Sequence, residues 1–145
     1  MTRSADDLVA EARKRISRIA PADVDEVVDA GGLVIDIRPQ QLREEEGPFP
    51  GAIVIERNVL EWRLDPQGDH RIPHVTGYDQ PVIIVCSGGF ASSLAAAALT
   101  DLGFSSAADL EGGYQAWRAW IDADAVVQLD HYRENLERVA TVRKR

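Results

Sequence analysis

The most constraining feature of the sequence is the junction around Cys86, where a short apolar run gives way to a glycine-containing loop and then to a helical segment. Val82–Val85 consists of β-branched apolar residues, which is typical of a strand buried on both faces. Gly88 and Gly89 follow the cysteine, and residues 94–102 form an alanine-rich stretch that favours a helix. This order predicts the carboxyl end of a parallel strand, where open α/β sheets place their ligands.

Cys86 is the only cysteine of the chain, and its place at the end of the apolar run predicts a functional thiol. A cysteine is also often a small buried core residue. Such a structural cysteine would more naturally lie inside the apolar run, whereas this one precedes two glycines, which let a backbone curl around an anion. The loop amides and the positive end of the following helix would favour the thiolate over the thiol.

Length and composition limit the class of protein. The 145 residues suffice for one domain with its own core. One cysteine excludes an internal disulfide, and the three scattered histidines lack metal-ligand spacing, so we expect neither a metal nor another cofactor. The net charge of −8 argues against nucleic acid as a partner. Since we find neither a signal-peptide pattern nor an apolar run of membrane-spanning length, we expect a soluble cytoplasmic protein with no membrane partner.

Short apolar runs alternate with helical segments, which predicts a parallel sheet covered by helices on both faces. Strands are expected at residues 33–37, 52–55, 82–85 and 107–110, and helices at residues 4–20, 23–30, 58–64, 94–102 and from 114 onward. The stretch between Arg38 and Gly51 is polar and ends in the chain breakers Pro48, Pro50 and Gly51, so we expect a loop there.

A final helix carries an apolar stripe. Leu129, Tyr132, Leu136 and Val139 recur at alternating spacings of three and four. We expect this stripe to pack against its own domain, and a contact between two copies of the chain is the alternative.

Four motifs, taken together, carry a family resemblance. The first is Asp36-Ile37-Arg38 after an apolar run, the second is Pro50-Gly51-Ala52-Ile53, the third is the loop from Cys86 to Ser92, and the fourth is Gly112-Gly113-Tyr114-Gln115-Ala116-Trp117. In this order and spacing they resemble the Asp-x-Arg strand end, Pro-Gly-Ala segment, active-site cysteine loop and Gly-Gly-x-x-x-Trp motif of the rhodanese family of single-domain sulfurtransferase-like proteins.

The resemblance implies an α/β fold and a domain organisation. The expected fold is a rhodanese-like three-layer sandwich, with a central, mostly parallel five-stranded sheet flanked by helices and with extra helices at both ends. The expected parts are an N-terminal helical extension over residues 1–18, the rhodanese-like domain over 19–121 and a C-terminal helical tail over 122–145.

The resemblance also implies an activity. The Cys86 thiolate would accept a sulfane sulfur from a donor, hold it as a persulfide, and pass it to an acceptor such as cyanide or another thiol. Asp36 and Arg38 are implied to be structural, as a buried ion pair. The residues whose backbone amides would hold the sulfur or an anion are Ser87, Gly88, Gly89, Phe90, Ala91 and Ser92.

The loop departs from the pattern of family members that act on thiosulfate. Such loops usually carry a basic residue, but no residue between Cys86 and Ser92 is charged, and Ala91 replaces a common hydroxyl donor. We therefore expect thiosulfate to be a poor donor and a less charged persulfide to be a better one. Any cation for the donor must come from another segment, and the candidates are Arg43, Arg57 and Arg63.

Two other functions compete with sulfur transfer. A cysteine phosphatase uses a related loop, but it needs an arginine six positions after the cysteine, where this chain has Ser92. The second alternative is a catalytically weak rhodanese module that senses redox state or persulfide, or binds a partner, because a single reachable thiol can be oxidised or form a mixed disulfide. Formation of a persulfide from a donor would separate this alternative from a sulfurtransferase.

Overall fold

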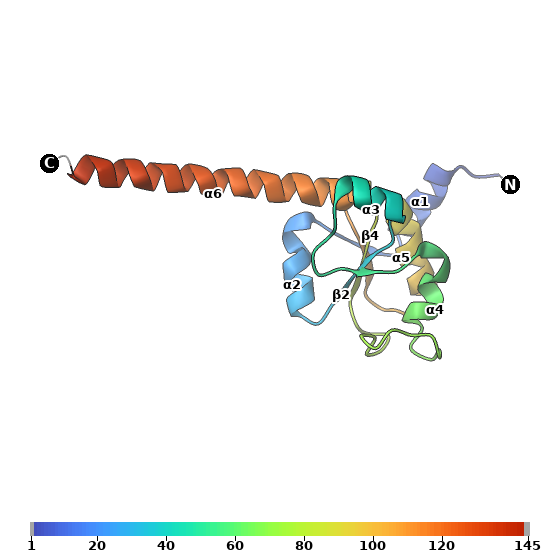
Figure 1. The fold of residues 1–145 in the computed structure, drawn as a ribbon. Coiled ribbons are helices and arrows are strands. Elements are labelled where there is room, and N and C mark those ends of the chain that lie inside the picture. Colours follow the sequence, from blue (N-terminus) through green and yellow to red (C-terminus); the bar gives the residue numbers. More distant parts are fainter. Residues whose placement is uncertain (1, 144–145) are drawn as a thin grey trace.

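A computed structural model describes residues 2–143 and, in the last helix, the side chains up to residue 138. Its core is a five-stranded, fully parallel sheet in the order β1-β5-β4-β2-β3, covered by helices on both faces (Figure 1). This confirms the predicted fold class. The strands are β1 (Ser17–Ile19), β2 (Leu33–Asp36), β3 (Ile53–Val54), β4 (Val82–Val85) and β5 (Ala107–Leu110).

The helices form the two outer layers. α1, α4 and α5 lie on one face, and α2 and the start of α6 lie on the other, while α3 lies near the carboxyl ends of the strands (Figure 1). The α-helices are α1 (Ala5–Arg13), α2 (Val24–Asp29), α3 (Gln40–Glu46), α4 (Leu60–Leu64), α5 (Ala91–Leu102) and α6 (Gly113–Arg143), and the short 3₁₀ helices are η1 (Pro21–Asp23) and η2 (Arg57–Val59).

The central strand β4 shows why the apolar runs are continuous. Val82 and Ile84 belong to the core on the α5 side, whereas Ile83 and Val85 belong to the core beneath α2 and α6. Side chains alternate between the two faces of a strand, so a strand covered on both faces needs apolar residues at every position.

The first predicted helix is wrong in its second half. Ser4 caps α1, with its hydroxyl oxygen accepting the N–H of Asp7 at 3.0 Å, but the helix ends at Arg13 and not at residue 20. Residues 17–19 instead form the edge strand β1, which pairs with β5. Ile16 and Ile19 fit a helical spacing, yet they are partly buried against opposite core clusters. Sheet pairing therefore overrides the local pattern, and β1 crosses the expected boundary at residue 18.

The predicted loop between Arg38 and Gly51 contains the helix α3. Its residues are good helix formers, and glutamine side chains donate to carboxylates four residues later, Gln40 to Glu44 and Gln41 to Glu45. α3 could not be predicted from the sequence pattern, because it has one apolar residue, Leu42, and therefore no apolar periodicity.

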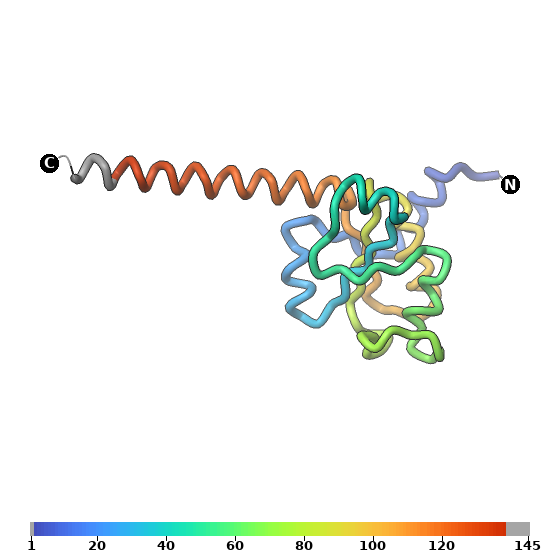
Figure 2. The backbone as a smooth tube through the Cα atoms, in the orientation of Figure 1, coloured from blue at the N-terminus to red at the C-terminus, as the bar shows by residue number. Residues whose placement is uncertain are grey.

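The tail is not a separate helix. α6 runs without a break from Gly113 to Arg143, across the expected boundary at residue 121, and it leaves the domain as a long rod (Figure 2). Leu129, Tyr132 and Leu136 are about half exposed, so the expectation that they pack on their own domain is wrong. The Val139 side chain lies outside the described residues. Within the described chain, no helix is long and apolar enough to cross a membrane.

Candidate active site

Cys86 lies directly after β4, at the carboxyl edge of the sheet, where the chain turns into α5. Its side chain is largely buried, with 7% of its surface exposed. The N–H groups of Gly89 and Ser92 donate to Sγ at 3.2 and 3.3 Å. Ser92 is in the first turn of α5, so the positive end of a 12-residue helix faces the sulfur. These donors stabilise negative charge on Cys86 without a cationic side chain in the loop.

The loop rests on the beginning of α6. The N–H of Tyr114 donates to the Cys86 carbonyl at 2.8 Å, and the N–H of Gln115 donates to the Ser87 carbonyl at 3.1 Å. A Cβ atom on Gly113 would lie 2.7 Å or less from the Cys86 carbonyl, the Ser87 carbonyl and the Gly89 nitrogen. The fourth sequence motif therefore needs its second glycine because α6 begins in direct contact with the cysteine loop.

A second polar group lies behind Cys86, and we call Arg18, Asp109, Ser92 and Ser93 the rear network. The Cys86 thiol donates to Ser92 Oγ at 3.2 Å, and Ser92 Oγ donates to Asp109 Oδ2 at 2.9 Å. Ser93 Oγ donates to the same oxygen at 2.7 Å, and Arg18 Nε donates to Asp109 Oδ1 at 3.0 Å. Asp109 is fully buried. Arg18, Asp109 and Ser93 were not predicted as site residues, although the carboxylate of Asp109 inside the apolar run 107–110 was a signal.

Asp36 and Arg38 form a buried ion pair, with Arg38 Nη2 donating to Asp36 Oδ2 at 2.8 Å. Arg38 also donates to Glu46 Oε1 and to the Gly47 carbonyl, and its guanidinium lies 4.0 Å from the centroid of the Tyr114 ring. Burial by itself would lower the pKa of Arg38, but hydrogen bonds and the negative charges of Asp36 and Glu46 raise it above its ordinary value. Arg38 therefore stays charged, and its contacts join β2, α3 and α6.

Glu46 connects this ion pair to the first residue of the loop. Its Oε2 accepts the Ser87 hydroxyl at 2.6 Å and the Gln115 side-chain amide at 3.2 Å. Partial burial by itself would raise the pKa of Glu46, but hydrogen bonds from Ser87, Gln115 and Arg38 lower it below its ordinary value. The loop is thus held at Ser87 by a carboxylate from α3.

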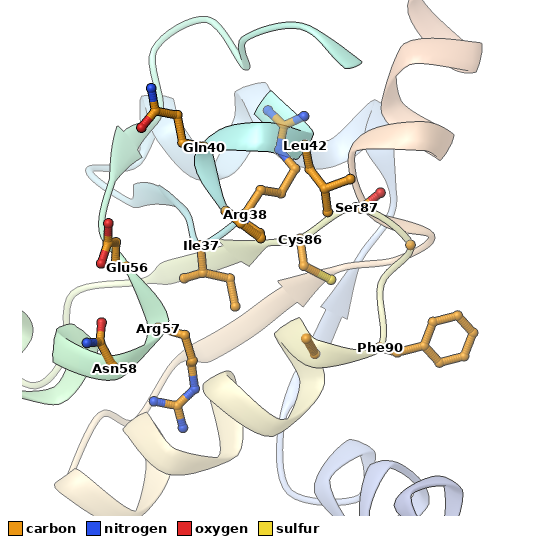
Figure 3. Close-up of a pocket in the computed structure, with 13 residues that line it drawn as sticks. Ile37, Arg38, Gln40, Leu42, Glu56, Arg57, Asn58, Cys86, Ser87 and Phe90 are labelled. Atoms are coloured by element: carbon orange, nitrogen blue, oxygen red, sulfur yellow. The ribbon is translucent and has the colours of Figure 1, made fainter. Parts of the chain in front are cut away.

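A pocket of about 590 Å³ opens in front of the sulfur (Figure 3). Its wall is mainly apolar and is contributed by the end of β2, the start of α3, the segment after β3 and the cysteine loop. The Phe90 ring points outward from Cys86 and is 59% exposed (Figure 3). The lining residues are Ile37, Arg38, Pro39, Gln40, Leu42, Glu56, Arg57, Asn58, Cys86, Ser87, Gly88, Phe90 and Ala91.

The structure brings one of the three candidate arginines to this pocket. Arg57 lines it and also donates to Glu61 Oε1 at 2.7 Å. Arg43 faces a different pocket beside α3, where its Nε donates to the Arg38 carbonyl at 3.2 Å. Arg63 donates to the His70 carbonyl at 2.6 Å. Among the described residues, no group of three or more histidine, cysteine, aspartate or glutamate side chains is placed to hold a metal ion.

Comparison with known proteins gives a family and curated relatives. The model of the rhodanese-like domain matches residues 20–119. Thiosulfate sulfurtransferase GlpE of Pseudomonas aeruginosa is 32% identical over 108 residues, covering 74% of this chain and 88% of that protein. The GlpE protein of Ectopseudomonas mendocina is 31% identical over 102 residues, covering 70% of this chain and 84% of that protein.

Solved structures agree with this result. A Rhodopseudomonas palustris protein, described as of unknown function and as a possible tyrosine phosphatase, is 31% identical with a TM-score of 0.72, covering 82% of this chain and 92% of that one. The human single-domain sulfurtransferase TSTD1 shares the fold, with a TM-score of 0.59 at 19% identity, covering 70% of this chain and 95% of that one. The family model covers residues 20–119, which are most of the chain and include the cysteine loop, so this protein belongs to the family of rhodanese-like domains.

Proposed function

We propose that this protein is a rhodanese-type sulfurtransferase that carries sulfane sulfur on Cys86. The observation that carries the proposal is a largely buried thiol that receives two backbone N–H groups and opens onto a mainly apolar pocket. The curated relatives named thiosulfate sulfurtransferase support the same activity. A cytoplasmic location and the absence of a metal or other cofactor stay predictions.

The reaction has two displacement steps. In the first, the Cys86 thiolate attacks the outer sulfur of the donor, and a new S–S bond forms while the donor's own bond to that sulfur breaks. With thiosulfate as donor, the electron pair of the broken bond leaves with sulfite. In the second step, cyanide or a thiolate attacks the outer sulfur, and Cys86 leaves as a thiolate.

The loop suits both steps because its amides favour negative charge at the sulfur. Gly89 and Ser92 stabilise the thiolate that attacks first and leaves last. The outer sulfur of a persulfide on Cys86 would lie farther into the pocket, beside the loop residues that line it, and we propose that the amides of these residues hold its charge. These residues are Ser87, Gly88, Phe90 and Ala91. Asp36 and Arg38 keep the structural role predicted for them.

Intact mass spectrometry tests the proposal. Incubation of the reduced protein with thiosulfate or with a small organic persulfide should add the mass of one sulfur atom, and later addition of cyanide should remove it. Because the loop has no charged side chain, we expect fuller loading from the persulfide. A protein that keeps its mass with every donor would be a weak module of the sensing or partner-binding type.

Phosphate chemistry is the competing enzymatic function, and the description of the Rhodopseudomonas palustris protein raises it. A phosphate clamp needs an arginine six positions after the cysteine. Ser92 occupies that position, and its hydroxyl is bonded to Asp109 and Cys86. Without an arginine at that position the loop has no side chain to bind a phosphate through two hydrogen bonds, so the geometry supports sulfur transfer instead.

Arg57 is the arginine that we expect to affect the donor. Arg57→Ala should raise the KM for thiosulfate by about threefold, with a smaller effect on an uncharged persulfide, because an exposed ion pair contributes little. Steady-state kinetics at two salt concentrations measure this, and salt should weaken thiosulfate binding in the wild type. Arg63→Ala is the comparison, since Arg63 binds the His70 carbonyl instead. Equal KM values for thiosulfate in all three proteins would mean that only backbone amides bind the donor.

The oligomeric state was predicted as a monomer or a homodimer through the C-terminal helix. Exposure of Leu129, Tyr132 and Leu136 supports the homodimer, because their spacing fits the seam between two paired helices. We expect the wild type to sediment as two chains and Leu129→Asp/Leu136→Asp to sediment as one. Gln128→Asp, which adds a charge beside the stripe, should stay dimeric. One-chain mass for all three proteins would favour the monomer.

A further inference from the structure

The N-terminal segment, which precedes the matched family domain, reaches the back of the cysteine loop. Arg13 ends α1 and Arg18 lies in β1, and both come before residue 20, where the family match begins. The Gly89 carbonyl accepts Arg13 Nη2 at 2.8 Å and Arg18 Nη2 at 3.1 Å. Two guanidinium groups therefore bind one carbonyl of the loop that holds Cys86.

This contact fixes the direction of a loop amide. The carbonyl of Gly89 and the N–H of Phe90 belong to one planar trans peptide, so they point in opposite directions. Because the carbonyl is held toward the arginines, the N–H of Phe90 must point away from them. Positive charge at a carbonyl also polarises its peptide group and makes the N–H a stronger donor.

The same arginines also contact the rear network behind the sulfur, at Asp109 and Ser93. Arg18 is paired with the fully buried Asp109 at 3.0 Å, and Asp109 is one hydroxyl group, that of Ser92, away from Cys86. Arg13 Nε donates to Ser93 Oγ at 3.1 Å, and its guanidinium lies 5.3 Å from the centroid of the Phe90 ring. Without Arg18, the Asp109 carboxylate would oppose a thiolate on Cys86.

Ser92 can serve either neighbour, because a hydroxyl donates one hydrogen bond and rotates freely. When Cys86 is a thiol, it donates to Ser92, and Ser92 donates to Asp109. When Cys86 is a thiolate, the Ser92 hydrogen can turn to the sulfur, since Ser93 and Arg18 still satisfy Asp109. The rear network thus supplies a third donor to the sulfur whenever the charge returns to it.

We infer that Arg13 and Arg18 are positioning residues for Cys86. Both arginines orient the loop through the Gly89 carbonyl. Arg18 also neutralises Asp109, so that Ser92 can stabilise the thiolate. The inference rests on the proposed function, which it deepens by assigning part of the active site to the N-terminal segment. Several charged groups face Cys86. Arg18 and Asp109 lie behind it, and Arg38, Glu56 and Arg57 line the pocket in front. The carboxylate of Glu46 acts on the loop through its hydrogen bond to Ser87.

The test is the pH profile of alkylation by iodoacetamide, in which the thiolate displaces iodide and no sulfur donor is needed. Arg18→Met should move the midpoint of the profile upward by about one pH unit and slow alkylation at neutral pH by about tenfold. Arg18→Met/Asp109→Asn removes both charges, so its midpoint should return toward that of the wild type. A purely structural role for Arg18 would not give this recovery.

Two more variants complete the test. Arg13→Met, which leaves no buried charge unpaired, should slow alkylation at neutral pH by about threefold. Arg15→Met is the matched control, because Arg15 lies in the same segment but pairs on the surface with Asp101, near the far end of α5, and it should behave as the wild type.

The inference is overturned if Arg18→Met folds and shares the profile of Arg15→Met, or if the double variant keeps the full upward shift. If Arg18→Met does not fold, a wild-type rate and midpoint in Arg13→Met overturns it. Failure of the wild type to gain sulfur in the mass experiment would instead refute the proposed function, because alkylation does not depend on a donor.

Discussion

Cys86→Ser is expected to abolish sulfur loading completely while the protein stays folded, with a change in the free energy of unfolding of about 1 kcal/mol or less. A serine hydroxyl is a poor nucleophile at neutral pH and forms no persulfide. It can still accept the N–H groups of Gly89 and Ser92, and it can donate to Ser92 Oγ, so no buried polar group loses its partner.

Intact mass after donor treatment, together with urea unfolding, measures both effects. Wild-type protein alkylated at Cys86 is the control for sulfur bound elsewhere, since the chain has one cysteine. Sulfur gained by the serine variant at the wild-type level would exclude Cys86 as the carrier. A large loss of stability in the variant would show that the thiol is mainly a core residue.

The local sequence was sufficient to predict β4 and the cysteine loop. A strand covered on both faces shows as an unbroken apolar run, and the junction of Val85 with Cys86 and two glycines marks its end without any knowledge of distant segments. The closing motif is equally local, although its physical reason is not. Only the structure shows that Gly113 must lack a side chain because it touches the Cys86 carbonyl.

The support of the loop could not be predicted, because it comes from positions far apart in the sequence. Arg18 and Asp109 are 91 residues apart, and Ser87 and Glu46 are 41 residues apart. β1 was assigned to a helix, since a three-residue edge strand leaves little pattern and its pairing partner is remote. This error hid the route by which Arg13 and Arg18 reach the cysteine loop.

The arginine candidates show a related limit. Arg57 lines the pocket because it follows β3, which ends at the same edge of the parallel sheet as the strand before Cys86. Arg43 could not be placed in the same way, because its direction depends on α3, which had no apolar pattern to predict it. The position of a long charged side chain depends on the carbonyls and carboxylates around it, and only the folded chain shows which of these groups are near.

Gly89→Ala is expected to reduce the rate of sulfur loading by about 100-fold, because the variant loses a hydrogen-bond donor directed at the reacting charge. Gly89 has φ +85°, and an added Cβ atom would lie 2.8 Å from the Gly112 nitrogen and 3.0 Å from the Gly113 nitrogen. The neighbouring atoms are backbone and cannot rotate away. The loop must therefore move, and the N–H of Gly89 loses its 3.2 Å bond to Sγ.

Gly51→Ala is the matched control for backbone strain, because Gly51 has a similar φ of +82° but no atom within 4 Å of an added Cβ. We expect this variant to lose about 1 kcal/mol of stability and to keep its sulfur loading. Gly89→Ala should lose more, about 2–4 kcal/mol, because it adds a collision to the same strain. Mass spectrometry and urea unfolding of both variants separate the two effects. Equal loading rates in the two proteins would mean that the Gly89 amide does not hold the sulfur, and the charge on Cys86 would then rest on Ser92 and the N-terminus of α5.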